Sequence, residues 1–309
     1  MARERLWEQK DCYFEKDGHA CIFTLNRPQV LNSYSWDIVD GLLRAVNEVK
    51  DDLDVGALII TGAGRAFSSG ANVKGMAGYE TPYEEGLEPT QEAKLQLGAD
   101  ARVRATLARK EGAPGGGFLD REYVRYRHKR WAILREMEVP VIAAINGWAI
   151  GAGLDIAMAC DILIASESAK FGYFYTKVGW VTDMGGCWYL ARAIGTYRAM
   201  ELILTGDAWD ANEARLMGLV GRVVPDEELL PTAIAMAERM AANGPYAVRM
   251  DKDLIYKAME LDFRNWMDYL ILPQTIQTAD PEIEKAHVEA ARRHLADKTR
   301  YMQKGPKLD

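Results

Sequence analysis

The sequence predicts an α/β domain that ends in a helical appendage. Up to residue 225, short runs of β-branched and aromatic residues alternate with segments whose apolar residues recur at helical spacing. Beyond that point, only helical patterns follow one another. The chain has 309 residues, 49% of them hydrophobic, so we expect one large core over 1–225 and a helical region over 226–309.

Charge and cysteine usage argue against several classes of protein. The 45 acidic and 38 basic residues give a net charge of −7 and are spread along the chain, which is atypical of a nucleic-acid-binding surface. The four cysteines show neither CxxC spacing nor a flanking histidine cluster, so we expect no metal site and no disulfide framework. The charged N-terminal segment lacks the apolar region of a secretory signal, and a reducing cytoplasm is the expected location.

The first elements predict a strand, a helix and a second strand in a βαβ crossover. Residues 20–25 form an apolar, β-branched run that ends before Pro28, where proline prevents further ladder bonding. Ser35 can cap the helix that follows, because apolar residues then recur at helical spacing up to Val46. The continuous apolar run 57–61 is typical of a strand that is covered on both faces.

The glycine-rich segment 62–76 directly follows that second strand, at the edge of a parallel sheet where ligands bind. It lacks the third glycine of a dinucleotide fingerprint, and the chain contains no P-loop motif, so a nucleotide site is not predicted. A simple turn is the alternative. Residues 78–118 then lose their periodicity, which is typical of an insertion that serves as a lid or as a solvated loop. Helical spacing returns over 119–138.

The stretch 141–161 predicts a buried strand, a bend and an apolar helix that carries Asp155. The small residues between 147 and 153 allow the backbone of the bend to pass close to another group. The free N–H groups of the helix and the positive end of its dipole would face that bend, so an anion or a developing oxyanion is the expected guest. Asn146, Asp155 and Asp161 interrupt the apolar run, which argues against a transmembrane helix.

The rest of the chain predicts two strands and a series of helices. Residues 162–166 and 219–224 are the predicted strands. The aromatic, glycine-rich segment 171–186, whose single carboxylate is Asp183, fits neither a helical nor a strand period. Helices are predicted over 189–204, 211–217, 227–242, 246–259, 262–278 and 281–302.

Five motifs follow one another between about residue 20 and residue 225. They are LNRPQVLNS, GAGRAFSSGANVKGM, AAINGWAIGAGLDIAMACD, FGYFYTKVGW and AMELILTGDAWDANEARLMGLVGRVV. Together they resemble the crotonase superfamily of enoyl-CoA hydratases and isomerases. The resemblance implies a spiral of ββα turns, a C-terminal helical trimerisation region, and a homotrimer or a dimer of trimers. It also implies an acyl-CoA thioester substrate, with coenzyme A as part of the substrate and no separate cofactor.

The resemblance also implies positions for an oxyanion hole and for the substrate. The backbone N–H groups of Ala71 and Ala152 match the pair that holds the thioester oxygen, where each preorganised donor is worth about 2.7–4 kcal/mol. The segment 27–32 and the carbonyls near 68–71 match the part that holds the nucleotide end of coenzyme A. The implied contacts with coenzyme A are Arg27, Ser68, Gly70 and Ala71. The implied pocket wall consists of Met76, Tyr173, Phe174 and Trp180.

The acidic residues depart from the hydratase pattern. A hydratase pairs two acids around one water, at positions that match Asp155 and Tyr175, and the second is a tyrosine here. A phenol whose pKa is near 10 is a poor general base at neutral pH. Asp183 matches a position that is acidic in dienoyl-CoA isomerases, where it shuttles a proton, and in 4-chlorobenzoyl-CoA dehalogenases, where it is the nucleophile. The isomerases share the acid at the Asp155 position, which favours enolate proton chemistry.

Structural roles stay open for each of these residues. Asp155 is alternatively a partner of the helix dipole, and Asp183 a turn former before a pair of glycines. Tyr175 is alternatively part of the core or of the pocket wall, and we give it an acid role only as a hypothesis. Asp161 is expected to cap or tie backbone groups.

The expected protein is an enzyme of the enoyl-CoA hydratase or isomerase type, that is, a lyase or an isomerase. It would stabilise a thioester enolate and exchange protons through Asp155 and Asp183. One alternative is a hydrolase or dehalogenase that uses Asp183 as a nucleophile on a cyclic or aromatic acyl-CoA. A lesser alternative is a noncatalytic relative that binds acyl-CoA or RNA, although the net negative charge weighs against RNA.

Overall fold

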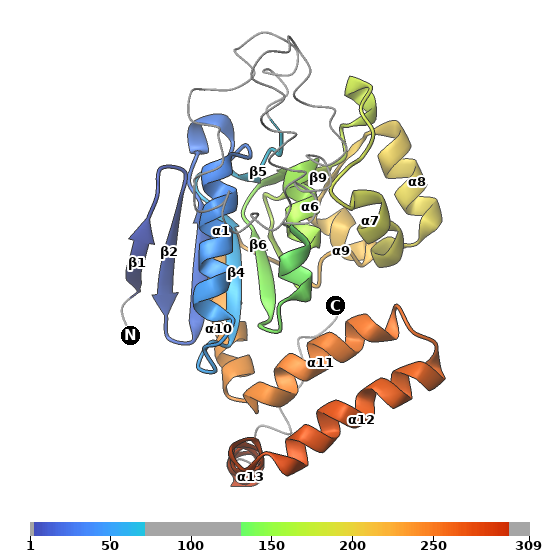
Figure 1. Cartoon of the computed structure of the whole chain (residues 1–309). Coiled ribbons are helices and arrows are strands. Elements are labelled where there is room, and N and C mark those ends of the chain that lie inside the picture. Colours follow the sequence, from blue (N-terminus) through green and yellow to red (C-terminus); the bar gives the residue numbers. More distant parts are fainter. Residues whose placement is uncertain (1–2, 72–130, 297–309) are drawn as a thin grey trace, which may run out of the picture.

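A computed structural model describes residues 3–71 and 131–296 of the chain (Figure 1). These residues form two β-sheets, with helices on both faces of the larger one and three helices grouped at the C-terminal end. The predicted insertion at 78–118, Met76 and the first part of the predicted helix 119–138 lie outside the described residues. In the described part of that helix, residues 131–136 are helical and residues 137–138 form a bend.

The larger sheet has seven described strands in the order β1-β2-β3-β4-β6-β8-β11. Antiparallel pairing joins β1 (Glu4–Glu8), β2 (Cys12–Asp17) and β3 (Ala20–Leu25). Parallel pairing joins β3, β4 (Ala57–Gly62), β6 (Val141–Ile145), β8 (Ile162–Ser166) and β11 (Arg222–Val224). The central strands are continuous apolar runs because helices cover both of their faces.

A smaller sheet has four described strands in the order β10-β9-β7-β5. Its parallel strands are β5 (Ala66–Ser68), β7 (Trp148–Ile150) and β9 (Lys170–Gly172), and β10 (Ala208–Asp210) is antiparallel to β9. Each of β5, β7 and β9 follows a strand of the larger sheet after a short bend. The chain therefore alternates between two sheets before it enters a helix, as the predicted spiral of ββα turns requires.

Alternation of side chains along the parallel strands creates two hydrophobic cores. Ile22, Ile59 and Ile142 pack with α10 (Leu229–Ala241). The residues next to them along the chain belong to a larger core that includes α1 (Trp36–Val49) and α6 (Ala152–Met158). Successive side chains of a strand point to opposite faces, so the larger sheet is the middle of three layers.

The remaining helices surround this core. They are α7 (Gly186–Ile194), α8 (Thr196–Thr205), α9 (Ala211–Met217), α11 (Pro245–Ala258), α12 (Phe263–Ala279) and α13 (Pro281–Ala296). Single turns of 3-10 helix are η1 (Pro28–Val30), η3 (Thr176–Val178) and η4 (Asp226–Glu228). In Figure 1, α11, α12 and α13 lie together below the sheets, on the side away from β5 and β9.

Most predicted elements are confirmed. Ser35 caps α1, since its hydroxyl accepts the Ile38 N–H at 3.3 Å. The predicted helix over 189–204 is wrong, because Gly195, with φ 84°, ends α7 and begins α8. The hairpin of β1 and β2 and the three-residue strand β7 were not predicted. The segment 171–186, for which neither a helix nor a strand was predicted, contains the last two residues of β9 and the 3-10 turn η3.

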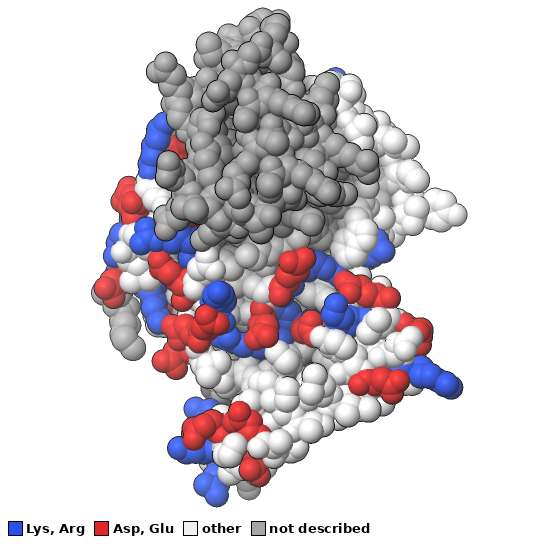
Figure 2. Space-filling model, in the orientation of Figure 1, with Lys and Arg blue, Asp and Glu red and all other residues white. Residues whose placement is uncertain are grey.

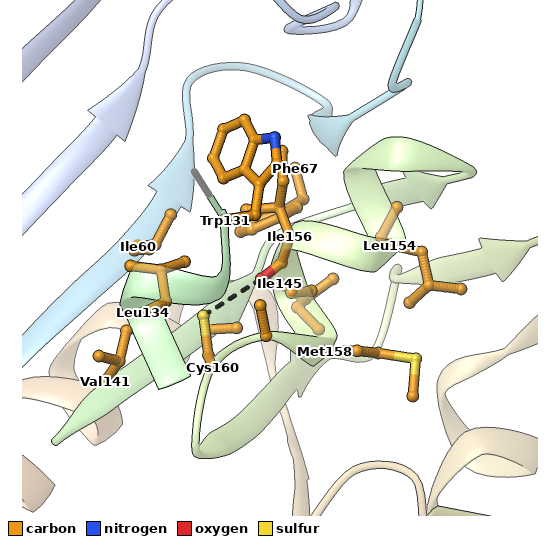
Figure 3. Close-up of a cluster of buried hydrophobic side chains, with 14 of the residues drawn as sticks. Ile60, Phe67, Trp131, Leu134, Val141, Ile145, Leu154, Ile156, Met158 and Cys160 are labelled. Atoms are coloured by element: carbon orange, nitrogen blue, oxygen red, sulfur yellow. Dashed lines mark hydrogen bonds between the residues drawn. The ribbon is translucent and has the colours of Figure 1, made fainter. Parts of the chain in front are cut away.

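Helix α6 is buried along its whole length, since all seven of its residues are buried. Its Leu154 and Ile156 pack in the larger core with Ile145 of β6, Phe67 of β5 and Leu134 (Figure 3). A helix that is covered all round is a core element rather than a surface helix. The carboxyl group of Asp155 therefore enters the interior of the protein with α6.

Asp161, at the end of the stretch 141–161, ties the backbone together. Its Oδ2 accepts a hydrogen bond from the backbone N–H of Val141 at 2.7 Å, so the carboxylate links the end of the stretch to its beginning, at the first residue of β6. Its Oδ1 accepts the hydroxyl of Tyr256, from α11, at 2.6 Å. The predicted backbone role of Asp161 is confirmed, and one of its partners comes from the C-terminal helices.

A buried ion pair with Lys252 of α11 completes this junction. Lys252 Nζ lies 2.8 Å from Asp161 Oδ2 and donates to the carbonyl oxygens of Leu134 and Val139, each at 3.0 Å. Burial lowers the pKa of Lys252 and raises the pKa of Asp161, against the mutual attraction of the two charges. Such a pair holds two elements in register, and loss of one partner leaves the other charge uncompensated in the interior.

None of the helices within 3–71 and 131–296 combines the length and the apolarity that are needed to span a bilayer.

Replacement of Lys252 with Met should lower the free energy of unfolding by about 3–5 kcal/mol, because the Asp161 carboxylate stays buried without its cation. Urea denaturation measures this loss. The matched control is Lys257→Met on the same helix. Lys257 pairs with Glu260 at 3.1 Å near the surface, and the change there should cost less than about 1 kcal/mol. Equal losses for the two variants would contradict the role given to the buried pair.

Candidate active site

Asp155 is a carboxylate held inside the apolar helix α6. The residue is only 1% exposed. Gly151, with φ 51° and ψ −122°, turns the chain from β7 into α6, so Asp155 falls in the first turn of the helix. The positive end of the helix dipole favours a negative charge there. A buried carboxylate also needs hydrogen-bond donors, and the structure supplies them from another segment.

Two tyrosines between β9 and η3 donate to this carboxylate. The hydroxyl of Tyr173 lies 2.9 Å from Asp155 Oδ1, and the hydroxyl of Tyr175 lies 3.0 Å from Asp155 Oδ2. The two rings stack, with centroids 6.2 Å apart and planes at 20°. Each oxygen of the buried carboxyl group therefore lies within hydrogen-bond distance of its own phenolic hydroxyl.

Tyr175 also contacts a second carboxyl group. Asp183 lies in the turn that precedes α7, and its Oδ1 is 2.9 Å from the Tyr175 hydroxyl. The phenolic oxygen thus lies between Asp155 and Asp183. The structure brings together all three residues that the sequence analysis proposed as catalytic.

Both phenols remain protonated at physiological pH. Burial, followed by the negative charges of Asp155 and Asp183, raises the pKa of Tyr175 well above the ordinary value for a phenol. Burial and the charge of Asp155 have the same effect on the pKa of Tyr173. The two hydroxyls are therefore hydrogen-bond donors in this site, and neither serves as a simple general base.

Gly186, the first residue of α7, allows that helix to approach the carboxylate. A Cβ atom at this position would overlap Asp155 Oδ1 and would lie 2.7 Å from Cε1 of Tyr173. Contacts this short do not occur with a real side chain, so only glycine fits between α7 and the Asp155–Tyr173 pair. The start of α7 closes one side of the site.

The two segments that were predicted to hold the thioester oxygen lie next to each other. Gly70 has φ 75°, and a Cβ atom there would lie 2.7 Å from the Ile150 oxygen and 2.9 Å from the Ala152 nitrogen. The bend that leads to Ala71 therefore runs against the start of α6. Ala152 is the first residue of that helix, where a backbone N–H has no acceptor within the helix.

A buried asparagine holds the bend before these segments. Asn32, with φ 54°, donates its amide N–H groups to the oxygens of Ala63 and Ala66 at 2.9 and 2.7 Å. Its Oδ1 accepts the N–H of Arg27 at 2.8 Å, and its carbonyl accepts the hydroxyl of Ser68 at 2.7 Å. This role of Asn32 was not predicted from the sequence. The available signal is that asparagine tolerates left-handed backbone better than most residues.

The side chain of Arg27 is engaged within the protein. Its Nε lies 3.3 Å from Asp11 Oδ2, both side chains are largely buried, and its Nη1 donates to the Ser33 oxygen at 3.1 Å. The guanidinium group thus supports the bend. The contact of Arg27 with coenzyme A stays a prediction.

The residues predicted for the pocket wall differ in their surroundings. Tyr173 is completely buried, and its role as a donor to Asp155 was not predicted. Phe174 and Trp180 are half-buried, and the backbone N–H of Trp180 donates to the backbone carbonyl oxygen of Tyr175 at 2.9 Å. A tyrosine two residues from Tyr175 was the signal that could have identified the second donor. Within the described ranges, no group of three or more His, Cys, Asp or Glu side chains is placed to hold a metal ion.

Comparisons with known proteins lead to one family. A family model for enoyl-CoA hydratase/isomerase matches residues 15–119 and 110–269. The chain is 38% identical over 246 residues to a probable enoyl-CoA hydratase of Mycobacterium bovis. The aligned residues are 80% of this chain and 81% of that protein. It is 34% identical over 256 residues to a short-chain-enoyl-CoA hydratase of Clostridium acetobutylicum, with coverage of 82% and 84%.

Solved structures are similar over nearly the whole chain. An enoyl-CoA hydratase from Bacillus anthracis superposes with a TM-score of 0.67 at 30% identity and covers 94% of this chain and 93% of that one. An enoyl-CoA hydratase subunit I from Geobacillus kaustophilus gives a TM-score of 0.73 at 27% identity, with coverage of 93% and 97%.

Replacement of Gly186 with Ala should destabilise the protein by about 1–3 kcal/mol, since the added methyl group must displace the Asp155 carboxylate or the Tyr173 ring. Thermal or urea denaturation measures the loss. The matched control is Gly221→Ala, where the nearest atom to an added Cβ is the Leu163 oxygen at 3.9 Å and the change should be small. A Gly186→Ala protein as stable as the control would show that α7 does not press on the site.

Proposed function

Because this chain belongs to the enoyl-CoA hydratase/isomerase family, we propose that it binds an unsaturated acyl-CoA thioester and moves protons at its carbon atoms. It is an acyl-CoA-processing enzyme of this family. The observation that carries the proposal is the pair of carboxyl groups, Asp155 and Asp183, that converge on one phenolic hydroxyl. One carboxylate removes a proton from the substrate, and the other carboxyl group delivers a proton to a different carbon atom.

The thioester enolate is the intermediate of this proposed reaction. Loss of a proton from the carbon next to the thioester places negative charge on the thioester oxygen. The N–H groups of Ala71 and Ala152 would hold that oxygen, and the contact of Gly70 with the start of α6 supports their proximity. Coenzyme A would lie along the bend of residues 27–32 and 68–71, with contacts from Arg27, Ser68, Gly70 and Ala71. The reaction needs no cofactor apart from the coenzyme A of the substrate.

Proton transfer fits this site better than hydration by two carboxylates around one water. The position that supplies the second acid of a hydratase holds Tyr175, whose raised pKa keeps it protonated. Its oxygen lies where both Asp155 and Asp183 can reach it. The arrangement thus supports migration of a double bond, in which one proton is removed and one is added.

We further propose that the enzyme acts in the cytoplasm as a homotrimer or a dimer of trimers. Large apolar side chains are exposed on two helices, Tyr197 and Leu204 on α8 and Phe263, Ile271 and Leu272 on α12. Figure 2 shows largely uncharged surface over α8 and over the middle of α12. Exposed apolar patches of this kind support association with further copies of the chain.

Replacement of Asp155 or Asp183 with Asn should lower kcat by about 10²–10⁴-fold on a panel of 2-enoyl-, 3-enoyl- and dienoyl-CoA substrates, because each change removes one proton-transfer group. Steady-state rates measure the effect. The matched control is Asp207→Asn on the surface, which should leave kcat unchanged. An unchanged rate for Asp183→Asn would remove Asp183 from the mechanism. Incorporation of labelled solvent oxygen into Asp183 in a single turnover would instead establish it as a nucleophile.

Replacement of Ala152 with Pro should lower kcat by about 10²–10³-fold, because proline lacks the N–H that is proposed to hold the enolate oxygen. Proline is tolerated at the first position of a helix, so α6 should still form. The control Ala152→Gly keeps the N–H and should retain most of the activity. Turnover of Ala152→Pro equal to that of Ala152→Gly, in proteins of equal thermal stability, would exclude this N–H from the oxyanion hole.

A further inference from the structure

The hydroxyl of Tyr175 has one hydrogen and two carboxyl neighbours. Its oxygen lies 3.0 Å from Asp155 Oδ2 and 2.9 Å from Asp183 Oδ1, and both distances are those of a hydrogen bond. A hydroxyl donates one hydrogen bond and accepts through its lone pairs. If Tyr175 donates to one carboxylate, its contact with the other is a hydrogen bond only when that carboxyl group is protonated and donates to the phenolic oxygen.

Two ionised carboxylates do not satisfy this geometry. One of them would then face the lone pairs of the phenolic oxygen at hydrogen-bond distance, with no hydrogen between the two atoms. Both carboxylate oxygens lie about 3 Å from the same atom, so they are at most about 6 Å apart. Asp155 is buried and Asp183 is partly exposed, and two like charges at such a distance raise the affinity of one of the two carboxylates for a proton. With one proton on the pair, both contacts of the Tyr175 hydroxyl are hydrogen bonds.

We propose that Asp155 and Asp183 hold one proton between them, and that the Tyr175 hydroxyl transfers it from one carboxyl group to the other. The inference rests on the proposed function, which it deepens by assigning where the transferred proton is held and how it returns after each turnover. Whichever carboxyl group holds the proton is the acid, and the other is the base. Tyr175 acts through the two carboxyl groups and is a positioning residue that conducts the proton.

The reaction balances with one proton. The ionised carboxylate removes a proton from one carbon of the acyl chain, and the electrons of that C–H bond enter the conjugated enolate. The protonated carboxyl group gives its proton to a second carbon, and the enolate electrons form the new C–H bond. The substrate is isomerised without oxidation or reduction, and the proton now lies on the opposite carboxyl group.

A concerted shift through Tyr175 restores the starting state. The newly protonated carboxyl group transfers its proton to the phenolic oxygen while the phenol transfers its own proton to the other carboxylate. One O–H bond forms and one breaks on Tyr175, so the tyrosine stays neutral throughout. The raised pKa of Tyr175 is compatible with this step, because no free phenolate is formed.

Other titratable groups face the cluster from neighbouring elements. Tyr173 donates to Asp155 Oδ1 and stays protonated. On α7, Cys187 lies close enough to Tyr173 to contribute electrostatically to its raised pKa. The pKa of Tyr189, also on α7, is raised by burial, lowered by the charge of Arg135 and raised by that of Asp155. Because the hydrogen bond from Tyr173 stabilises an ionised Asp155, its loss should favour protonation of the pair, whereas loss of the Tyr175 bridge should disfavour it.

Infrared spectroscopy of the ligand-free enzyme tests the shared proton without reference to activity. The wild-type protein, labelled with ¹³C at its aspartate carboxyl carbons, should show the C=O band of one protonated carboxyl group at neutral pH. Either Asp155→Asn or Asp183→Asn should abolish the band, since the remaining carboxyl group has lost its charged partner. Absence of the band in the wild type, or its survival in one of the two variants, would overturn the proposal.

Two tyrosine variants separate the bridge from general structural support. The pH at which half of the band has disappeared gives the pKa of the carboxyl pair. In Tyr175→Phe this pKa should fall by about one, because the protonated carboxyl group loses the phenolic oxygen that accepts its hydrogen bond. In Tyr173→Phe the same pKa should rise, because the ionised Asp155 loses a donor. A shift in the same direction for both variants, or none for Tyr175→Phe, would overturn the role of Tyr175.

Kinetics give an independent readout. On an enoyl-CoA substrate that the wild type turns over, Tyr175→Phe should release a first equivalent of product at close to the normal rate and then slow by about tenfold. Because the slowed step follows the chemistry, kcat and KM should fall together and kcat/KM should stay unchanged. A variant with no slow phase would contradict the return of the proton through Tyr175. If the wild type turns over none of the substrates, the proposed function fails, and the infrared result still decides whether the proton is shared.

Discussion

The burial of one carboxyl group, that of Asp155, constrains the elements around it. A carboxyl group that is 1% exposed is tolerated only where hydrogen-bond partners surround it, and two phenolic hydroxyls provide them. The segment after β9 must therefore follow a path that brings both tyrosines to α6. Gly186 must lack a side chain so that α7 can lie against the same group. The arrangement of these elements follows from the need to accommodate this one carboxyl group.

Local sequence patterns predicted much of the scaffold. The central parallel strands have apolar runs that need no long-range information, and the glycine-rich bend before α6 was identified from its small residues alone. The family resemblance located Asp155, Tyr175 and Asp183. It also showed that the acid of a hydratase is replaced by tyrosine at position 175. What these patterns indicate is the type of residue that a position requires.

The remaining features depend on how distant segments meet. That Tyr175 lies between two carboxyl groups follows from the path of the turn from η3 to α7, which has no periodicity to interpret. Strand β7 has three residues, too few for a recognisable alternation. The left-handed conformation of Asn32 is stabilised by carbonyl groups more than 30 residues downstream. No local window of sequence contains such contacts.

The junction between Asp161 and α11 has a consequence for the order in which the nascent chain folds. Tyr256, which donates to Asp161, lies 95 residues after it, and Lys252 is close to the same point of the chain. While the ribosome is still extending the chain toward α11, the stretch that contains Asp155 has been synthesised but lacks the cation that compensates Asp161. The Asp161 carboxylate therefore gains its cation only once α11 has been synthesised, and a polypeptide that is released before that point lacks the group that compensates this charge.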